Sequence, residues 1–143
     1  MEIRPYKDED LDAVIELWLR VFPEAPAHND PSAVITRKLA VQRELFVVAV
    51  DKGGIVGTAM AGYDGHRGWV YSVGVSPDCR RRGVGSALMR RVERDLASIG
   101  CPKLNLQVRG VNREAVRFYE SLGYSTEDRV SMGRKLARAR DGA

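Results

Sequence analysis

The chain has 143 residues and a mass of 15.9 kDa, the size of one ordinary domain, so we expect a single domain over residues 1–143. Charged residues make up 29% and hydrophobic residues 44%, a globular composition that excludes a disordered chain. The net charge of +4 is uneven: residues 1–65 hold 7 Lys/Arg and 11 Asp/Glu (−4), whereas residues 66–143 hold 16 and 8 (+8). The basic half predicts an anionic partner, which is nucleic acid, an anionic membrane or a polyphosphate cofactor.

Several classes of protein are excluded by what the chain lacks. Its longest apolar run, residues 45–50, is far shorter than the ~20 residues that span a bilayer, and no apolar stretch follows Met1. Cys79 and Cys101 do not make a disulfide framework, and no Cys/His cluster predicts a metal site. We therefore expect a cytoplasmic protein without a signal peptide or a bound metal.

In the first half, a strand at residues 2–6 precedes a helix at residues 8–22, whose apolar side chains recur at helical spacing. A loop with three prolines, residues 23–31, comes next. Asp30 and Pro31 are typical of a helix N-cap and first turn, and predict a short helix that ends near Val41.

Three strands follow, joined by a turn and a polar loop. The predicted strands cover residues 45–50, 55–62 and 69–75. The glycine pair in residues 51–54 indicates a hairpin, and residues 63–68 form the polar connection before the third strand.

The second half is predicted to begin with an amphipathic helix at residues 83–99 that Gly100 ends. The remaining predicted elements are a strand at 104–108, a helix at 112–122, and a final pair of strands at 124–129 and 130–136. The strand–helix–strand unit from 70 to 108 should make its two strands parallel. The fold class is therefore α+β, with a mixed, mostly antiparallel sheet.

The most informative stretch joins the third of these strands to the long helix. It reads Val-Ser-Pro-Asp-Cys-Arg-Arg-Arg-Gly-Val-Gly-Ser over residues 75–86. A helix N-terminus presents free backbone N–H groups and a positive dipole end, and Gly83 and Gly85 let an anion approach that backbone. The stretch is neither a Walker A loop nor a dinucleotide fingerprint. It favours a phosphate site, and a tight turn with solvated arginines is the alternative.

Two motifs carry a family resemblance. Arg80-x-x-Gly83-x-Gly85, preceded by Val75-x-Pro77, resembles the acetyl-CoA motif of the GNAT family of N-acetyltransferases. Asn112-x-x-Ala115-x-x-Phe118-Tyr119-x-x-x-Gly123-Tyr124 resembles that family's second block, in the right order. The chain resembles a functionally unassigned bacterial branch and, more distantly, the ribosomal-protein N-terminal acetyltransferases. The resemblance implies a sheet of six to seven strands with a splayed parallel pair, flanked by about four helices.

The resemblance also implies which residues bind acetyl-CoA, the acetyl donor. Loop amides would hold the pyrophosphate, with arginine charge around them, and the splayed strand edge would pair with pantetheine and donate an N–H to the thioester carbonyl. Asn112 would bond to pantetheine, cap its helix, or do both. The implied cofactor-binding residues are Val73, Gly74, Val75, Arg80, Arg81, Arg82, Gly83, Val84, Gly85, Ser86 and Asn112.

Tyr119 matches the general acid of the family. When an amine attacks the acetyl group, CoA leaves as a thiolate that needs a proton, and a phenol can supply it. The alternative is a core aromatic beside Phe118. Gln107 occupies the position of a glutamate base in the ribosomal-protein enzymes, and glutamine cannot act as that base.

The general base and the acceptor are left open. In the polar loop, Asp64 could accept or orient a proton and His66 is of the type that titrates near neutrality, although an ordinary turn is the alternative. The loop before the second helix, which often covers the acceptor in this family, adds weaker candidates. The candidate substrate residues are Glu24, His28, Tyr63, Asp64 and His66.

The leading hypothesis is therefore an enzyme that transfers acetyl from acetyl-CoA to a primary amine of a small molecule or a peptide N-terminus. A CoA-binding sensor without turnover is the alternative. Nucleic acid is not expected, because no aromatic residues interleave the basic ones, and a membrane surface is not expected, because the long helix needs its apolar face for the sheet. A monomer or a homodimer is expected. The acidic first half favours a cationic acceptor.

Overall fold

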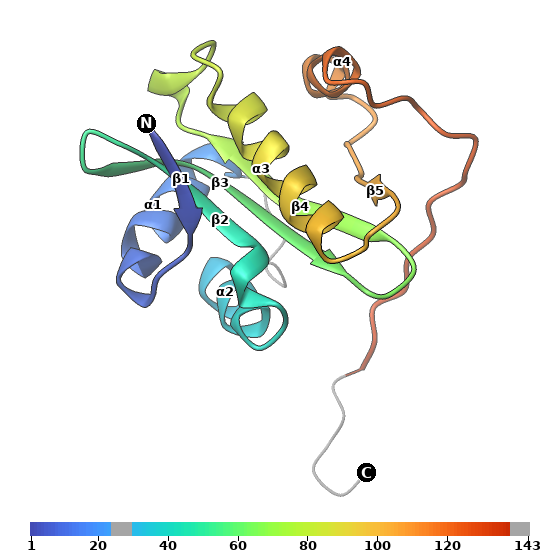
Figure 1. Ribbon diagram of the computed structural model, residues 1–143, viewed down its shortest axis with the longest axis horizontal. Coiled ribbons are helices and arrows are strands. Elements are labelled where there is room, and N and C mark those ends of the chain that lie inside the picture. The colour runs from blue at the N-terminus through green and yellow to red at the C-terminus, as the bar shows by residue number, and fades with distance from the viewer. Residues whose placement is uncertain (24–29, 138–143) are drawn as a thin grey trace, which may run out of the picture. The chain divides into compact units, whose positions relative to one another are not determined.

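The computed structural model describes residues 1–23 and 30–137 of the chain (Figure 1). The chain divides into two compact units, residues 1–107 and residues 108–143, and each is taken by itself. No helix among the described residues is both long enough and apolar enough to cross a membrane.

The first unit is built on a five-stranded mixed sheet. The strands lie in the order in which they occur along the chain, and only the last pair, β4 and β5, is parallel. Their bounds are β1 Glu2–Pro5, β2 Phe46–Asp51, β3 Gly54–Tyr63, β4 Gly68–Val75 and β5 Leu104–Asn105. The predicted meander and the parallel crossover are confirmed. β5 is shorter than the predicted 104–108, and pairs with β4 only at Gly68 and Trp69.

Three helices cover the two faces of this sheet. They are α1 Leu11–Val21, α2 Pro31–Leu39 and α3 Val84–Ser98. Thr58 of β3 bonds to Trp18 of α1, while a Cβ on neighbouring Gly57 would meet Leu88 and Val84 of α3. Since successive residues of a strand face opposite sides, α1 and α3 lie on opposite faces, and Figure 1 shows α3 running along β3 and β4.

The core between α1, α2 and the sheet is aromatic at its centre. Phe46 is fully buried, stacks on Tyr6 with ring centroids 4.7 Å apart, and lies 6.1 Å from Trp18. Val14, Leu17 and the other apolar residues predicted at helical spacing close around these rings. This packing fixes α1 against β3, which matters for the site below.

The second unit contains one helix among its described residues, α4 Arg113–Ser121. The predicted strands at 124–129 and 130–136 are wrong, because residues 124–137 form no strand. The described sheet therefore has five strands and not six to seven. Residues 125–128 are all polar, and the aliphatic side chains of Val130, Met132 and Leu136 are 87–90% exposed. Alternating residues alone do not hold an isolated hairpin together in water without an apolar face to pack on.

The helix starts follow the sequence more closely than the strand ends do. Asp30 caps α2, its carboxylate accepting the N–H of Ala33 at 3.1 Å, and Asn112 caps α4 in the same way through Ala115. The first predicted helix opens with a 3-10 turn, Asp8–Asp10, before α1 proper. The four described helices match the expected number.

Candidate functional site

Strand β4 carries a β-bulge in the stretch that the sequence predicts to bind acetyl-CoA. Thr58 of β3 pairs with Gly74, and Met60 pairs with Tyr71, so β4 uses one residue more than β3 between these two pairs. Within the bulge, Ser72 has a φ of +52°, a left-handed conformation that costs a non-glycine residue about 1–2 kcal/mol. A bulge takes backbone groups out of the ladder, so β4 is suited to presenting them to a ligand.

Gly74 lets α1 approach this bulge closely. A Cβ at Gly74 would lie 3.0 Å from Phe22 Cζ and 3.0 Å from Val21 Cγ1, so a larger residue would have to push these side chains aside. Its neighbours Val73 and Val75 are half-buried. The last turn of α1 is thereby placed directly against the predicted pantetheine-binding strand.

The loop after β4 ends in two left-handed residues. Arg81 has a φ of +64° and Gly83 a φ of +78°, and Gly83 is the N-cap of α3. A Cβ at Gly83 would meet no atom within 4 Å, and no side chain caps this end of the helix. Gly85 and Ser86 of the first turn are half-buried, and Val84 is buried. The position of a side chain at Gly83 is therefore open, and no side chain caps the backbone N–H groups of this turn.

The arginines of this loop are available for an anion. Arg80, Arg81 and Arg82 are all exposed. Among the residues that the structure describes, no carboxylate lies within 4.0 Å of their guanidinium groups. Guanidinium groups and helix-end N–H groups are the donors that phosphates prefer, so this chemistry fits a pyrophosphate.

Cys79, which precedes the arginines, is a half-buried free thiol at the end of a 3-10 turn, Pro77–Cys79. Over residues 1–23 and 30–137, no group of three or more His, Cys, Asp or Glu side chains could hold a metal ion.

The polar connection between β3 and β4 is a tight turn closed by its own aspartate. Asp64 Oδ1 accepts the backbone N–H of His66 at 2.7 Å and that of Arg67 at 2.8 Å. The N–H groups of Arg67 and His66 hold the pKa of the Asp64 carboxyl below its usual range. Asp64 and His66 are exposed, while Tyr63 is half-buried and its backbone is tied to Gln42. The bonds at Asp64 support the turn interpretation, and they involve only the backbone of His66, whose side chain is exposed.

Of the loop residues predicted near the acceptor, Glu24 and His28 lie outside the described residues. Asp30 lies at the end of that loop, and one of its carboxylate oxygens accepts the N–H of Ala33 to cap α2.

Tyr119 and Asn112 belong to the second unit. Tyr119 is half-buried on α4, with the rings of Phe118 and Tyr124 at centroid distances of 5.0 and 5.9 Å. Burial raises the pKa of Tyr119 to about 12. Asn112 Oδ1 accepts the N–H of Ala115 at 3.0 Å, so the capping role predicted for Asn112 is confirmed. The ring of Tyr119 packs beside Phe118, as the core-aromatic alternative requires, and its burial favours the protonated phenol.

Sequence reasoning missed two residues that shape β4. Thr58 and Trp18 are both buried and are hydrogen-bonded to each other, and Thr58 also bonds to the bulge. A threonine in a buried strand has no signature beyond its β propensity. Its polarity at a fully buried position is the one signal that might have drawn attention to it.

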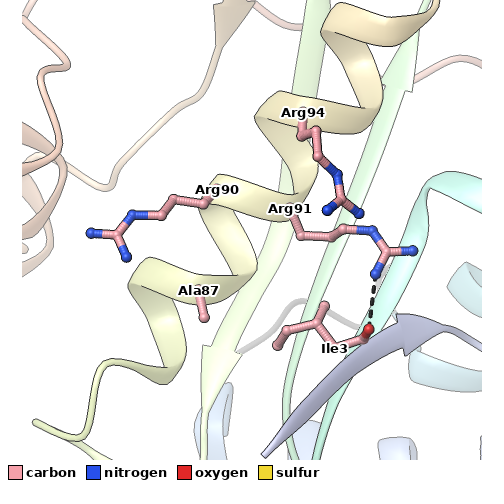
Figure 2. A pocket seen from close by; sticks show the side chains of 5 residues that line it. All are labelled: Ile3, Ala87, Arg90, Arg91 and Arg94. Atoms are coloured by element: carbon pink, nitrogen blue, oxygen red, sulfur yellow. Dashed lines mark hydrogen bonds between the residues drawn. The ribbon is translucent and has the colours of Figure 1, made fainter.

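A surface depression of about 400 Å³ lies elsewhere, between α3 and β1 (Figure 2). Arg91 donates to the carbonyl of Ile3 at 2.8 Å and to Asp95 at 2.9 Å, and Arg94 lies 3.7 Å from Asp95. In Figure 2, Arg90 extends away from these two arginines. Arg91 is thus engaged in holding α3 to the edge strand, and none of the predicted site residues lines this depression.

Comparisons with known proteins identify the family. The model of the acetyltransferase (GNAT) family matches residues 11–124. An acetyltransferase of Pectobacterium atrosepticum is 46% identical over 141 residues, which cover 99% of each chain.

Solved structures share the fold. The enzyme AAC(6')-Iy, in complex with a bisubstrate analogue of CoA and acetylneamine, has a TM-score of 0.79 at 22% identity, over 95% of this chain and 98% of that one. The ribosomal-protein-S18-alanine N-acetyltransferase of Escherichia coli has a TM-score of 0.72 at 24% identity, over 85% and 76%. With the family model and the bacterial relative in agreement, the chain belongs to the GNAT family of acetyltransferases, which use acetyl-CoA.

Proposed function

We propose that this acetyltransferase moves the acetyl group of acetyl-CoA directly to a primary amine, with Tyr119 as the general acid. The observation that carries the donor half of the proposal is the start of α3, where Gly83 is left-handed, open and uncapped beside three exposed arginines. Acetyl-CoA supplies the activated acetyl group. The rest of the chemistry belongs to side chains and backbone groups of this chain.

Binding of the donor is assigned to two stretches of the first unit. The backbone N–H groups from Arg81 to Ser86 would hold the pyrophosphate, and the guanidinium groups of residues 80–82 would add long-range attraction. Residues 73–75 would pair with pantetheine, since β5 leaves β4 after Trp69. In the second unit, Asn112 can add one bond through its amide nitrogen, because its Oδ1 already caps α4.

Tyr119 is suited to donate a proton and not to remove one. A phenol whose pKa is raised to about 12 by burial is protonated throughout the neutral range. The phenol would give its proton to the sulfur as the C–S bond breaks. Because the pKa of a thiol is only about 8.5, this transfer requires that the bound donor bring the two pKa values together.

The acceptor is proposed to be a cationic amine, a small molecule or a peptide N-terminus, and the turn at residues 63–68 to lie on its path. Asp64 would contribute charge more than proton transfer, because its lowered pKa makes it a weak base. Gln107 cannot act as a base either. His66 remains the exposed side chain of the turn that can take up a proton from the amine.

The proposal is tested by incubating the protein with acetyl-CoA and a panel of polyamines, amino acids, aminoglycosides and peptides, while free thiol is measured. Thiol release with at least one amine, matched by acetylated product, is the expected result. If acetyl-CoA raises the melting temperature and no amine releases thiol, the chain is a CoA-binding sensor. If acetyl-CoA does neither, the assignment of the α3 loop is wrong.

A further inference from the structure

Thr58 sits at the middle of a buried hydrogen-bond chain that ends on the β4 bulge. Trp18 Nε1 of α1 donates to Thr58 Oγ1 at 2.9 Å, and Thr58 Oγ1 donates to the carbonyl oxygen of Ser72 at 2.8 Å. Thr58 is 0% exposed and Trp18 is 4% exposed. The hydrogen-bond chain therefore links the helix and the strand through a buried bond, and the strand and the bulge through a part-buried one.

The direction of this chain is fixed by its two ends. The indole N–H of Trp18 can only donate, and the carbonyl of Ser72 can only accept. The hydroxyl of Thr58 must then accept from Trp18 and turn its own hydrogen toward Ser72. One orientation of the Thr58 hydroxyl satisfies the indole N–H, the hydroxyl itself and the Ser72 carbonyl. The hydroxyl therefore holds the strained residue Ser72 rigidly.

Holding the carbonyl of Ser72 also aims the next N–H. Ser72 O and Val73 N belong to one planar trans peptide, in which the C=O and N–H bonds point in opposite directions. Because Ser72 O is held by the side chain of Thr58, the N–H of Val73 points away from that hydroxyl. β5 pairs with β4 only at Gly68 and Trp69, so Val73 lies beyond the described ladder between these two strands.

We propose that Trp18 and Thr58 are positioning residues that aim the N–H of Val73 at the oxygen of the acetyl thioester. The inference rests on the proposed function, in which the edge of β4 meets the donor. An aimed N–H stabilises the charge that grows on that oxygen when the amine attacks, and it does so best when it need not reorient. The strain at Ser72 is then the cost of this orientation, and the hydroxyl of Thr58 offsets it.

The test compares three variants by kcat for acetyl transfer and by the Kd of acetyl-CoA. Thr58→Val keeps the shape and removes both bonds, and we expect kcat to fall about 100-fold, the scale of a lost oxyanion donor, with Kd changed less than about threefold. Thr58→Ser keeps the hydroxyl and should restore kcat to within about threefold. Trp18→Phe removes only the outer donor and should lower kcat about fivefold, the worth of one neutral hydrogen bond.

Val47→Ala is the matched control, because Val47 is a fully buried β2 residue outside the hydrogen-bond chain. Val47→Ala should lower the melting temperature and leave kcat within about threefold of the unmodified chain, as for Thr58→Ser. A Thr58→Val protein that folds and keeps its kcat overturns the proposal. So does a Thr58→Ser protein as slow as Thr58→Val.

A second measurement does not depend on turnover. In protein labelled with ¹⁵N-valine, acetyl-CoA should move the Val73 amide proton downfield, and free CoA should not. The shift should persist in Thr58→Ser and be lost in Thr58→Val. If no amine is acetylated, the proposed function fails and this spectrum still decides the positioning role; an equal shift in Thr58→Val contradicts it.

Discussion

Helices α3 and α4 begin in opposite ways. At α4, the side chain of Asn112 folds back and accepts the N–H of Ala115. At α3, the corresponding residue is Gly83, which has no side chain to offer and is held left-handed. A side-chain cap contributes typically about 1 kcal/mol, so α3 forgoes a stabilisation that α4 has.

This difference indicates which helix N-terminus keeps backbone N–H donors available for a ligand. In a capped helix, a side chain accepts one of the free N–H groups of the first turn. In an uncapped helix flanked by exposed arginines, these N–H groups and the guanidinium groups remain as donors. α2 is capped by Asp30, like α4. We therefore assign the ligand to the N-terminus of α3. The N-terminus of α4 is capped by its own side chain, and the helix also carries Tyr119.

The largest effect is expected from placing a carboxylate at the open helix end. Gly83→Glu should weaken acetyl-CoA binding about 1000-fold, the loss of roughly two charge-assisted hydrogen bonds, as measured by calorimetry. Gly83→Ala is the control, since it introduces the same left-handed strain without the charge and should weaken binding far less. Equal losses in both variants would mean that backbone strain, and not the anion site, sets the affinity.

A second prediction concerns α4. Tyr119→Phe removes one hydroxyl from the aromatic cluster and should lower kcat about 100-fold, within the usual range for a general acid, while the Kd of acetyl-CoA stays within about threefold. Phe118→Leu, on the same helix, serves as the control for packing. Unchanged turnover in Tyr119→Phe would remove the phenol from its assigned role.

The pH dependence of stability gives a third prediction. The phenol of Tyr119 has a pKa of about 12 when folded, against about 10 unfolded, so its contribution is fully present below pH 10 and is lost as the pH rises to about 12. Since one pKa unit corresponds to about 1.4 kcal/mol, the loss between pH 9 and pH 11 should be about 1.4 kcal/mol in the unmodified chain and be absent from Tyr119→Phe. Urea unfolding at pH 9 and pH 11 measures the difference between the two proteins, and parallel curves would contradict it.

The smallest effect tests the caps directly. Asn112→Ala and Asp30→Ala should each cost about 1 kcal/mol of unfolding free energy, because each removes one cap. If Asn112 also bonds to pantetheine, only Asn112→Ala weakens acetyl-CoA binding, by about fivefold for one hydrogen bond. Equal affinity in the two variants would limit Asn112 to capping.

The helix starts could be predicted because each depends on a few neighbouring residues. Asp30, Gly83 and Asn112 act through their own side chain or its absence, and the sequence shows that directly. The loop at residues 80–85 could be singled out for the same reason, because its motif is a short run of neighbouring residues.

The features that depend on distant residues could not be predicted. The bulge at Ser72 arises from a register shift between β3 and β4. The hydroxyl of Thr58, 14 residues earlier in the chain, donates to the carbonyl of Ser72. Nothing in a serine predicts a positive φ. The final strands were expected from alternating residues, but a strand needs a neighbour, and Val130 and Met132 have no apolar surface to pack on in the described structure.

The bond from Arg91 to Ile3 has a consequence for the sheet as a whole. β1 is an edge strand, and an edge strand is a template on which another chain can add itself. The guanidinium of Arg91 occupies the outward carbonyl of Ile3 and is itself anchored by Asp95. An incoming strand would have to displace a charge-assisted bond before making its own, so Arg91 of α3 protects this edge of the sheet against pairing with another chain.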